Sequence, residues 1–273
     1  MSAGQPAIAF ARLPALRGVH WLRDAYGMLS LARLPWLLLL FFYYLVLGLV
    51  DLLPFVGQFA APILKPVFAV GFLAAAWSQE RGGTPELKQL FEGFRSNLWA
   101  LLPLGIVLVV GITIAVLGTA FVDDGKLLDV LSGKTKFDDA LLSDDRVELA
   151  MLFAVACALP VMLALWFAPA LVVFQDCSAP QALGTSLRAA LANWRPIAVY
   201  GLLVFFYGGV VPGMVTAVIA LVAPTSLAFT IALVILMPYL FLFIATLHIS
   251  DYVSYRDIFH AEEAPEPGTS ATL

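Results

Sequence analysis

Charged side chains are scarce in this sequence. Asp, Glu, Lys and Arg make up 12% of its 273 residues, whereas hydrophobic residues make up 62%. A soluble domain averages about 25% charged residues and roughly 45–50% apolar ones. A soluble fold of this length could not cover so much apolar surface with so few charges, so we expect lipid to solvate the excess. The composition therefore predicts an integral membrane protein.

Residues that usually carry chemistry are equally sparse. Two cysteines, Cys157 and Cys177, are too few for a disulfide framework. No HExxH, GxSxG, CxxC or P-loop pattern occurs, and the three histidines fall in different predicted elements. No basic run of the kind that binds nucleic acid is present. We therefore predict no catalytic residue, no metal site, no cofactor and no nucleic-acid partner, and we expect that the protein is not an enzyme.

Long apolar runs dominate what is present. A helix needs about 20 mostly apolar residues to cross a bilayer, and six runs are long enough. They predict an all-α integral membrane fold with spans at about 35–53, 59–77, 98–122, 149–174, 197–222 and 226–249. We expect one six-helix transmembrane domain over 1–260. The acidic, Pro-containing tail 261–273 is predicted to be disordered.

One arrangement recurs three times along the chain. A short amphipathic stretch precedes a span, which is followed by a turn and a second span; these stretches are 18–33, 85–97 and 180–195. Each leads into a tryptophan that we expect at the level of the lipid headgroups, namely Trp36, Trp99 and Trp194. We predict three helical hairpins, each preceded by a short interfacial helix whose apolar face meets acyl chains.

The basic residues indicate the orientation. Most of the 15 Lys and Arg residues fall in segments 1–34, 78–96, 176–196 and 250–273, on one side of the predicted membrane. The loop 123–148 on the other side is rich in aspartate. Because basic loops stay in the cytoplasm, we predict a multi-pass protein of the bacterial inner membrane with both termini in the cytoplasm.

A lysine inside the second span is a candidate for function. An ionisable group within a membrane is costly and suggests a site with a polar partner. Asp51 ends the preceding span, so Asp51 and Lys65 form a candidate intramembrane polar pair. Alternatively, the long stem of Lys65 can extend its amine to the interface from a depth of about six residues, roughly 9 Å.

Three segments carry a resemblance that extends over nearly the whole chain. They are "GVHWLRDAYGML" at 18–29, "WFAPALVVFQ" at 166–175 and "YVSYRDIF" at 252–259. Together they resemble an uncharacterised family of six-span inner-membrane proteins from proteobacteria, which implies location and architecture. More distantly, the layout is similar to the membrane domain associated with some glycerophosphodiester phosphodiesterases, although this chain has no phosphodiesterase domain. That likeness implies a link to lipid metabolism.

The last of these segments follows the sixth span directly. Tyr252, Tyr255 and Arg256 are therefore predicted where the chain leaves the bilayer, in contact with lipid headgroups or with a partner protein. Arg256 could also pair with Asp257 or Asp251.

Two functions from different classes remain open. The first is a non-enzymatic scaffolding, assembly or lipid-organising role, with membrane lipids as partners and a second copy or another inner-membrane protein as a further possible partner. The alternative is a small transporter or channel, with a path near Lys65 and the even-numbered spans that contain Pro66, Pro160 and Pro238.

The orientation can be checked with reporter fusions. A reporter fused after Phe137 is expected to be periplasmic, and fusions after Gln89, Gln181 or His260 cytoplasmic, because of the distribution of Lys and Arg. A cytoplasmic signal at Phe137 would contradict the six-span topology.

Overall fold

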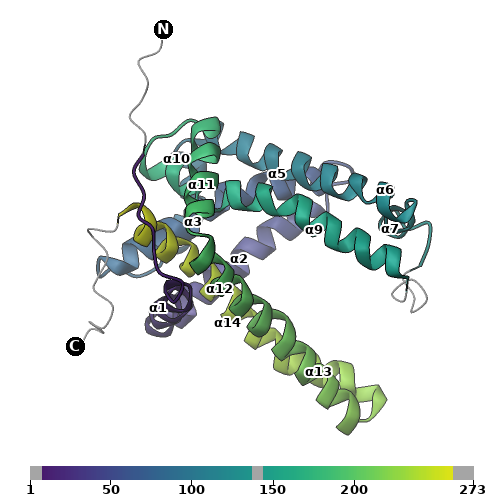
Figure 1. Cartoon of the computed structure of the whole chain (residues 1–273). Coiled ribbons are helices and arrows are strands. Elements are labelled where there is room, and N and C mark those ends of the chain that lie inside the picture. The colour runs from purple at the N-terminus through teal and green to yellow at the C-terminus, as the bar shows by residue number, and fades with distance from the viewer. Residues whose placement is uncertain (1–7, 137–143, 261–273) are drawn as a thin grey trace. The chain divides into compact units, whose positions relative to one another are not determined.

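The computed structural model describes residues 8–136 and 144–260, and within them every regular element is a helix (Figure 1). Six helical segments of this described part are long and apolar enough to cross a membrane. They are Arg33–Asp51, Gly57–Glu80, Leu98–Asp123, Asp145–Phe174, Trp194–Val222 and Ser226–Phe259. The all-α fold with six predicted spans is thereby confirmed. The predicted disordered tail lies outside the described residues.

The described helices follow one another along the chain. In chain order they are α1 (Arg17–Leu31), α2 (Arg33–Asp51), α3 (Gly57–Glu80), η1 (Leu87–Phe91), α4 (Glu92–Arg95), α5 (Leu98–Gly118), α6 (Ala120–Asp123), α7 (Lys126–Leu131), α9 (Asp145–Trp166), α10 (Ala168–Phe174), α11 (Ala179–Ala192), α12 (Trp194–Phe205), η2 (Phe206–Val210), α13 (Val211–Val222) and α14 (Thr225–Phe259).

Two spans depart from their predicted form. The helix of the sixth span does not stop near residue 249 but continues as α14 to Phe259, 35 residues in all. In the fourth span, α9 runs straight through Pro160, and the helix breaks at Phe167 instead. Pro169 then lies in the first turn of α10, where its missing N–H breaks no helical hydrogen bond.

The contacts divide the chain into two compact units, where the sequence predicts one domain. The first unit comprises the described residues up to 49, those of 68–96 and those from 189 onward. In this unit α1 packs against α14 and α12, and α13 packs against α14. Helices α2 and α3 run antiparallel, since Trp36 contacts Gln79 whereas Tyr43 contacts Phe72.

The second unit comprises residues 50–67 and 97–188. Here α5 packs along α9, and α10 contacts both of these helices. The Oγ of Ser186 in α11 donates a hydrogen bond to the carbonyl of Leu163 and accepts one from the Phe167 N–H, 3.0 Å away. The hydroxyl therefore satisfies backbone groups that the helix break at Phe167 sets free.

The predicted interfacial helices differ from one another. Residues 18–33 form most of α1, but its stripe of Trp21, Ala25 and Leu29 is completely buried by protein. This contradicts the predicted contact of that stripe with acyl chains. Helix α11 buries Thr185 and exposes Leu191, so its polar positions, too, pack inside the protein.

Gly18 allows α1 to lie very close to α12. A Cβ at this position would overlap the carbonyl oxygen of Pro196, whereas a Cβ at Gly27 of the same helix would meet nothing within 4 Å. We expect Gly18→Ala to destabilise the protein by about 1–3 kcal/mol because α1 would have to move outward. Gly27→Ala should be neutral or stabilise by about 0.5–1 kcal/mol through its higher helix propensity.

Thermal unfolding in detergent distinguishes the two variants. Equal midpoints for Gly18→Ala and Gly27→Ala would contradict the close contact of α1 with α12.

Candidate functional site

A buried carboxylate on α14 joins two segments that are far apart in the sequence. Asp257 is 2% exposed, and its Oδ2 accepts hydrogen bonds from Arg17 Nε at 2.5 Å and from Trp21 Nε1 at 3.0 Å. Its Oδ1 accepts from Arg256 Nη2 at 3.1 Å. A buried charge is tolerated only when it is paired and hydrogen-bonded, and Asp257 meets this condition.

Glu80, at the end of α3, extends this polar cluster. It forms an ion pair with Arg256, and its Oε2 accepts a hydrogen bond of 2.5 Å from the Tyr252 hydroxyl. The cluster therefore ties α3, α14 and α1 together. Segments 18–29 and 252–259 therefore meet in it.

The prediction that Tyr252, Tyr255 and Arg256 contact lipid headgroups is contradicted by their burial. Their exposed fractions are 5%, 2% and 7%. The physical reason is that α14 continues beyond the predicted exit point and α1 covers it, so these polar groups bind other parts of the protein. The predicted pairing of Arg256 with Asp257 is present.

The three tryptophans have different surroundings. Trp36 is fully buried, and its Nε1 donates a hydrogen bond of 2.7 Å to Gln79, whose amide donates to the Met28 carbonyl. This contradicts its predicted headgroup contact. Trp99 is 83% exposed and Trp194 59%, so a headgroup contact remains a prediction for these two.

The structure does not bring Asp51 and Lys65 together. Both side chains are exposed, and no ion pair joins them among the described residues. Lys65 lies on the surface of its helix, as expected for a lysine that extends along the helix toward the interface. The candidate intramembrane pair therefore has no geometric basis.

The acidic connection between the third and fourth spans is held by local ion pairs. Lys126 pairs with Asp144, and Arg146 pairs with Asp124. The hydrogen bond from Lys126 holds the pKa of the Asp144 carboxyl below its usual range, and the backbone N–H of Arg146 lowers it further. Asp144 thus serves as the N-cap of α9, where a carboxylate is favoured by the helix dipole.

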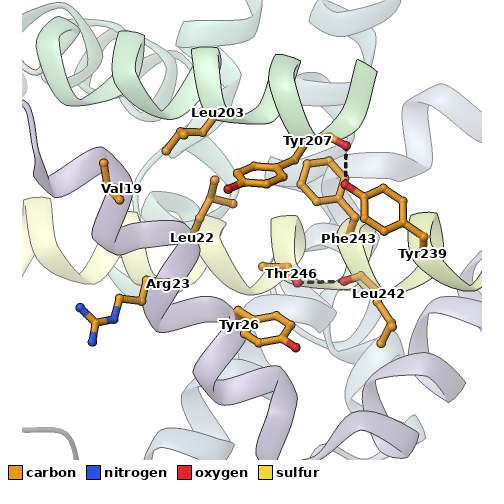
Figure 2. A pocket seen from close by; sticks show the side chains of 10 residues that line it. All are labelled: Val19, Leu22, Arg23, Tyr26, Leu203, Tyr207, Tyr239, Leu242, Phe243 and Thr246. Carbon is orange, nitrogen blue, oxygen red and sulfur yellow. Dashed lines mark hydrogen bonds between the residues drawn. The ribbon is translucent and has the colours of Figure 1, made fainter. Parts of the chain in front are cut away.

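The first unit contains a pocket that the sequence did not predict (Figure 2). It has a volume of about 550 Å³, within the range of about 300–1,000 Å³ that is common for small-molecule sites. Four structural elements supply its walls. Its lining residues are Val19, Leu22, Arg23 and Tyr26 from α1, Leu203 and Tyr207 from α12 and η2, and Tyr239, Leu242, Phe243 and Thr246 from α14.

An irregular helical turn shapes one wall of this pocket. Phe206–Val210 is a π-helix, a form that is rare and frequent at functional sites. The Tyr239 hydroxyl of α14 donates a hydrogen bond of 2.6 Å to the Tyr207 carbonyl in this turn, as Figure 2 shows. A Cβ at Gly208 would come within 2.8 Å of the Phe243 ring, so a larger residue here would require this ring to move.

The polar groups at the pocket differ in their partners. Tyr239 is hydrogen-bonded, whereas the hydroxyls of Tyr26 and Tyr207 and the guanidinium of Arg23 have no hydrogen-bond or ion-pair partner in the described part of the chain. In Figure 2 the Arg23 side chain extends outward from the rim of the pocket. The site thus combines an apolar interior with an unpaired cation at its edge.

His248 shows a further arrangement that sequence reasoning did not find. Its ring stacks on Phe72 with centroids 4.0 Å apart, and Tyr43 contacts it edge-on. The histidine is therefore part of an aromatic cluster between α2, α3 and α14. The described residues contain no group of three or more His, Cys, Asp or Glu side chains that could hold a metal ion.

Six apolar spans in an all-helical chain define a multi-pass membrane protein. The chain is 32% identical to a probable inner membrane protein of Burkholderia thailandensis over 261 residues, which cover 93% of this chain and 94% of that protein. It belongs to the family of this inner membrane protein. No profile of a described protein family matches the chain, and no solved structure matches it.

The polar cluster makes a testable contribution to stability. Removing one partner of a buried ion pair strands the other charge, at a cost of about 3–5 kcal/mol. We therefore expect Arg17→Met and Asp257→Asn each to lower the free energy of unfolding in detergent strongly. The double variant should lose about 1–3 kcal/mol less than the sum of the two single-variant losses.

The matched control is the pair of Lys65 and Asp51, which the sequence suggested and which forms no ion pair among the described residues. Lys65→Met and Asp51→Asn should be additive within about 0.5 kcal/mol. Additive losses for Arg17 and Asp257, or strong coupling between Lys65 and Asp51, would contradict the described contacts.

Proposed function

We propose that this protein is a non-enzymatic, lipid-organising component of the inner membrane, and that it holds a membrane lipid in the pocket between α1, η2 and α14. The observation that carries the proposal is the pocket itself. Its walls are mostly apolar, and it lies beside helices long enough to span the bilayer. The molecules that surround such a pocket are lipids, whose acyl chains match its interior.

The use of the buried polar residues supports a non-enzymatic role. Arg17, Glu80, Tyr252, Arg256 and Asp257 are engaged with one another. Groups that hold helices together in this way are not free to act as a nucleophile or a general base. The polar cluster thus contributes architecture, and it supports α1 as one wall of the pocket.

The transporter alternative has less support. It requires a path near Lys65, but Lys65 is exposed and does not line the pocket between α1, η2 and α14. The fourth span breaks at Phe167 and not at Pro160. Its proline therefore does not interrupt the helix, as the proposed transport path through proline-broken spans would require.

A bulky residue in the pocket wall tests the proposed function. Leu203 lines the pocket, whereas its neighbour Leu202 does not and is 69% exposed. We expect Leu203→Trp to fill the space and displace the bound lipid, while Leu202→Trp retains it. The measurement is lipid per protein after purification in a mild detergent, by native mass spectrometry of both variants.

The thermal unfolding midpoint of each variant, compared with that of the unaltered chain, serves as the control that the variant is folded. If folded Leu203→Trp protein keeps as much lipid as the unaltered chain, the pocket is not a lipid site and the proposed function is wrong.

A further inference from the structure

We propose that the pocket selects an anionic phospholipid, whose headgroup is bound by Arg23; this inference rests on the proposed function. The lining residues include this one charged side chain, and it lies at the rim. An amphiphile with a negative headgroup and apolar chains complements this distribution of charge. A zwitterionic lipid brings an additional positive charge close to the guanidinium and is therefore bound less well.

The charge of Arg23 is available to a ligand. Its neighbour Asp24 instead contacts Arg17, 3.5 Å away, and Arg17 is also bound to Asp257. Arg23 is exposed and has no carboxylate within ion-pair distance among the residues described. A guanidinium presents several N–H donors to the oxygens of a phosphate, which makes arginine well suited to bind phosphate groups.

Two tyrosines add hydrogen-bond donors near the same ligand. Tyr26 and Tyr207 line the pocket, and their hydroxyls have no hydrogen-bond partner within residues 8–136 and 144–260. A hydroxyl next to lipid chains loses the hydrogen bonds that water would supply. The ester and phosphate oxygens of a phospholipid can accept those bonds, whereas a plain hydrocarbon cannot.

A second pocket of the first unit has neither a cation nor a hydroxyl group in its wall. It is lined by Leu37, Leu38, Phe41, Met237, Pro238, Phe241 and Leu242 and has a volume of about 420 Å³. All of its lining side chains are apolar, so it offers nothing that would distinguish one headgroup from another. The selectivity we propose is a property of the pocket that contains Arg23.

The predicted cytoplasmic position of the N-terminal segment is consistent with an anionic ligand. Arg23 lies on α1, in the N-terminal segment that the distribution of basic residues predicts to be cytoplasmic. The cytoplasmic leaflet carries anionic lipids and attracts Lys and Arg close to its surface. An anionic phospholipid would thus reach the pocket from the leaflet that faces it.

The test compares two probes with the same acyl chains, phosphatidylglycerol and phosphatidylethanolamine. The full chain is stripped of lipid in detergent and titrated with each lipid, and binding is followed by native mass spectrometry. We expect phosphatidylglycerol to bind about tenfold more tightly, as for one charge-assisted hydrogen-bonded contact. Arg23→Gln should remove this preference, and Arg23→Lys should retain most of it.

Arg33→Gln is the matched control, because Arg33 is also exposed but does not line the pocket. It should leave the preference unchanged. Arg23→Gln should unfold at the same temperature as the unaltered chain, since the Arg23 side chain has no ion-pair or hydrogen-bond partner among residues 8–136 and 144–260. Added salt should weaken the binding of phosphatidylglycerol more than that of phosphatidylethanolamine.

The two proposals fail in different ways. If Arg23→Gln keeps the full preference, or if the unaltered chain shows none, the selectivity inferred for Arg23 is wrong, although the loss of lipid from Leu203→Trp would still support a lipid site. If Leu203→Trp retains all lipid, the site itself is wrong.

Discussion

The ion-paired carboxylate of Asp257 is the interaction on which the architecture of the first unit depends. It accepts hydrogen bonds from Arg17 and Trp21 of α1 and from Arg256 of its own helix. A carboxylate so deeply buried would be very unfavourable alone. Helix α1 must therefore lie where its arginine and tryptophan reach α14, and this constraint fixes one wall of the pocket.

The face of α1 that packs on the protein and the face that lines the pocket are adjacent. Trp21 and Ala25 are buried, whereas Leu22, Arg23 and Tyr26 line the pocket. Because residues three or four positions apart share a helix face, one short helix can both hold the unit together and complete a site. Any shift of α1 would change both the ion pair with Asp257 and the wall of the pocket, so the polar cluster and the proposed lipid site are linked through geometry alone.

The three segments that suggested a family resemblance each have a structural role in the fold. Two of them meet at Asp257, and the third, 166–175, contains the helix break at Phe167 and the buried start of α10. All three segments are thus places where helices are joined or redirected. The likeness to the membrane domain of glycerophosphodiester phosphodiesterases remains a prediction, and the lipid-binding proposal rests on the pocket without it.

The sequence by itself determined the class of the protein and its six spans, because the length of an apolar run follows directly from the thickness of a bilayer. It also showed Arg256 and Asp257 as possible partners, since adjacent residues can be paired without knowledge of the fold. It could not show that Arg17 binds Asp257, 240 positions away, or that Trp36 is buried. A polar end of a span has the same composition whether it meets headgroups or another helix. Only the tertiary structure decided between contact with headgroups and contact with another helix, by placing α1 on α14. The same packing created a pocket from three segments of the chain that share no common signal in the sequence.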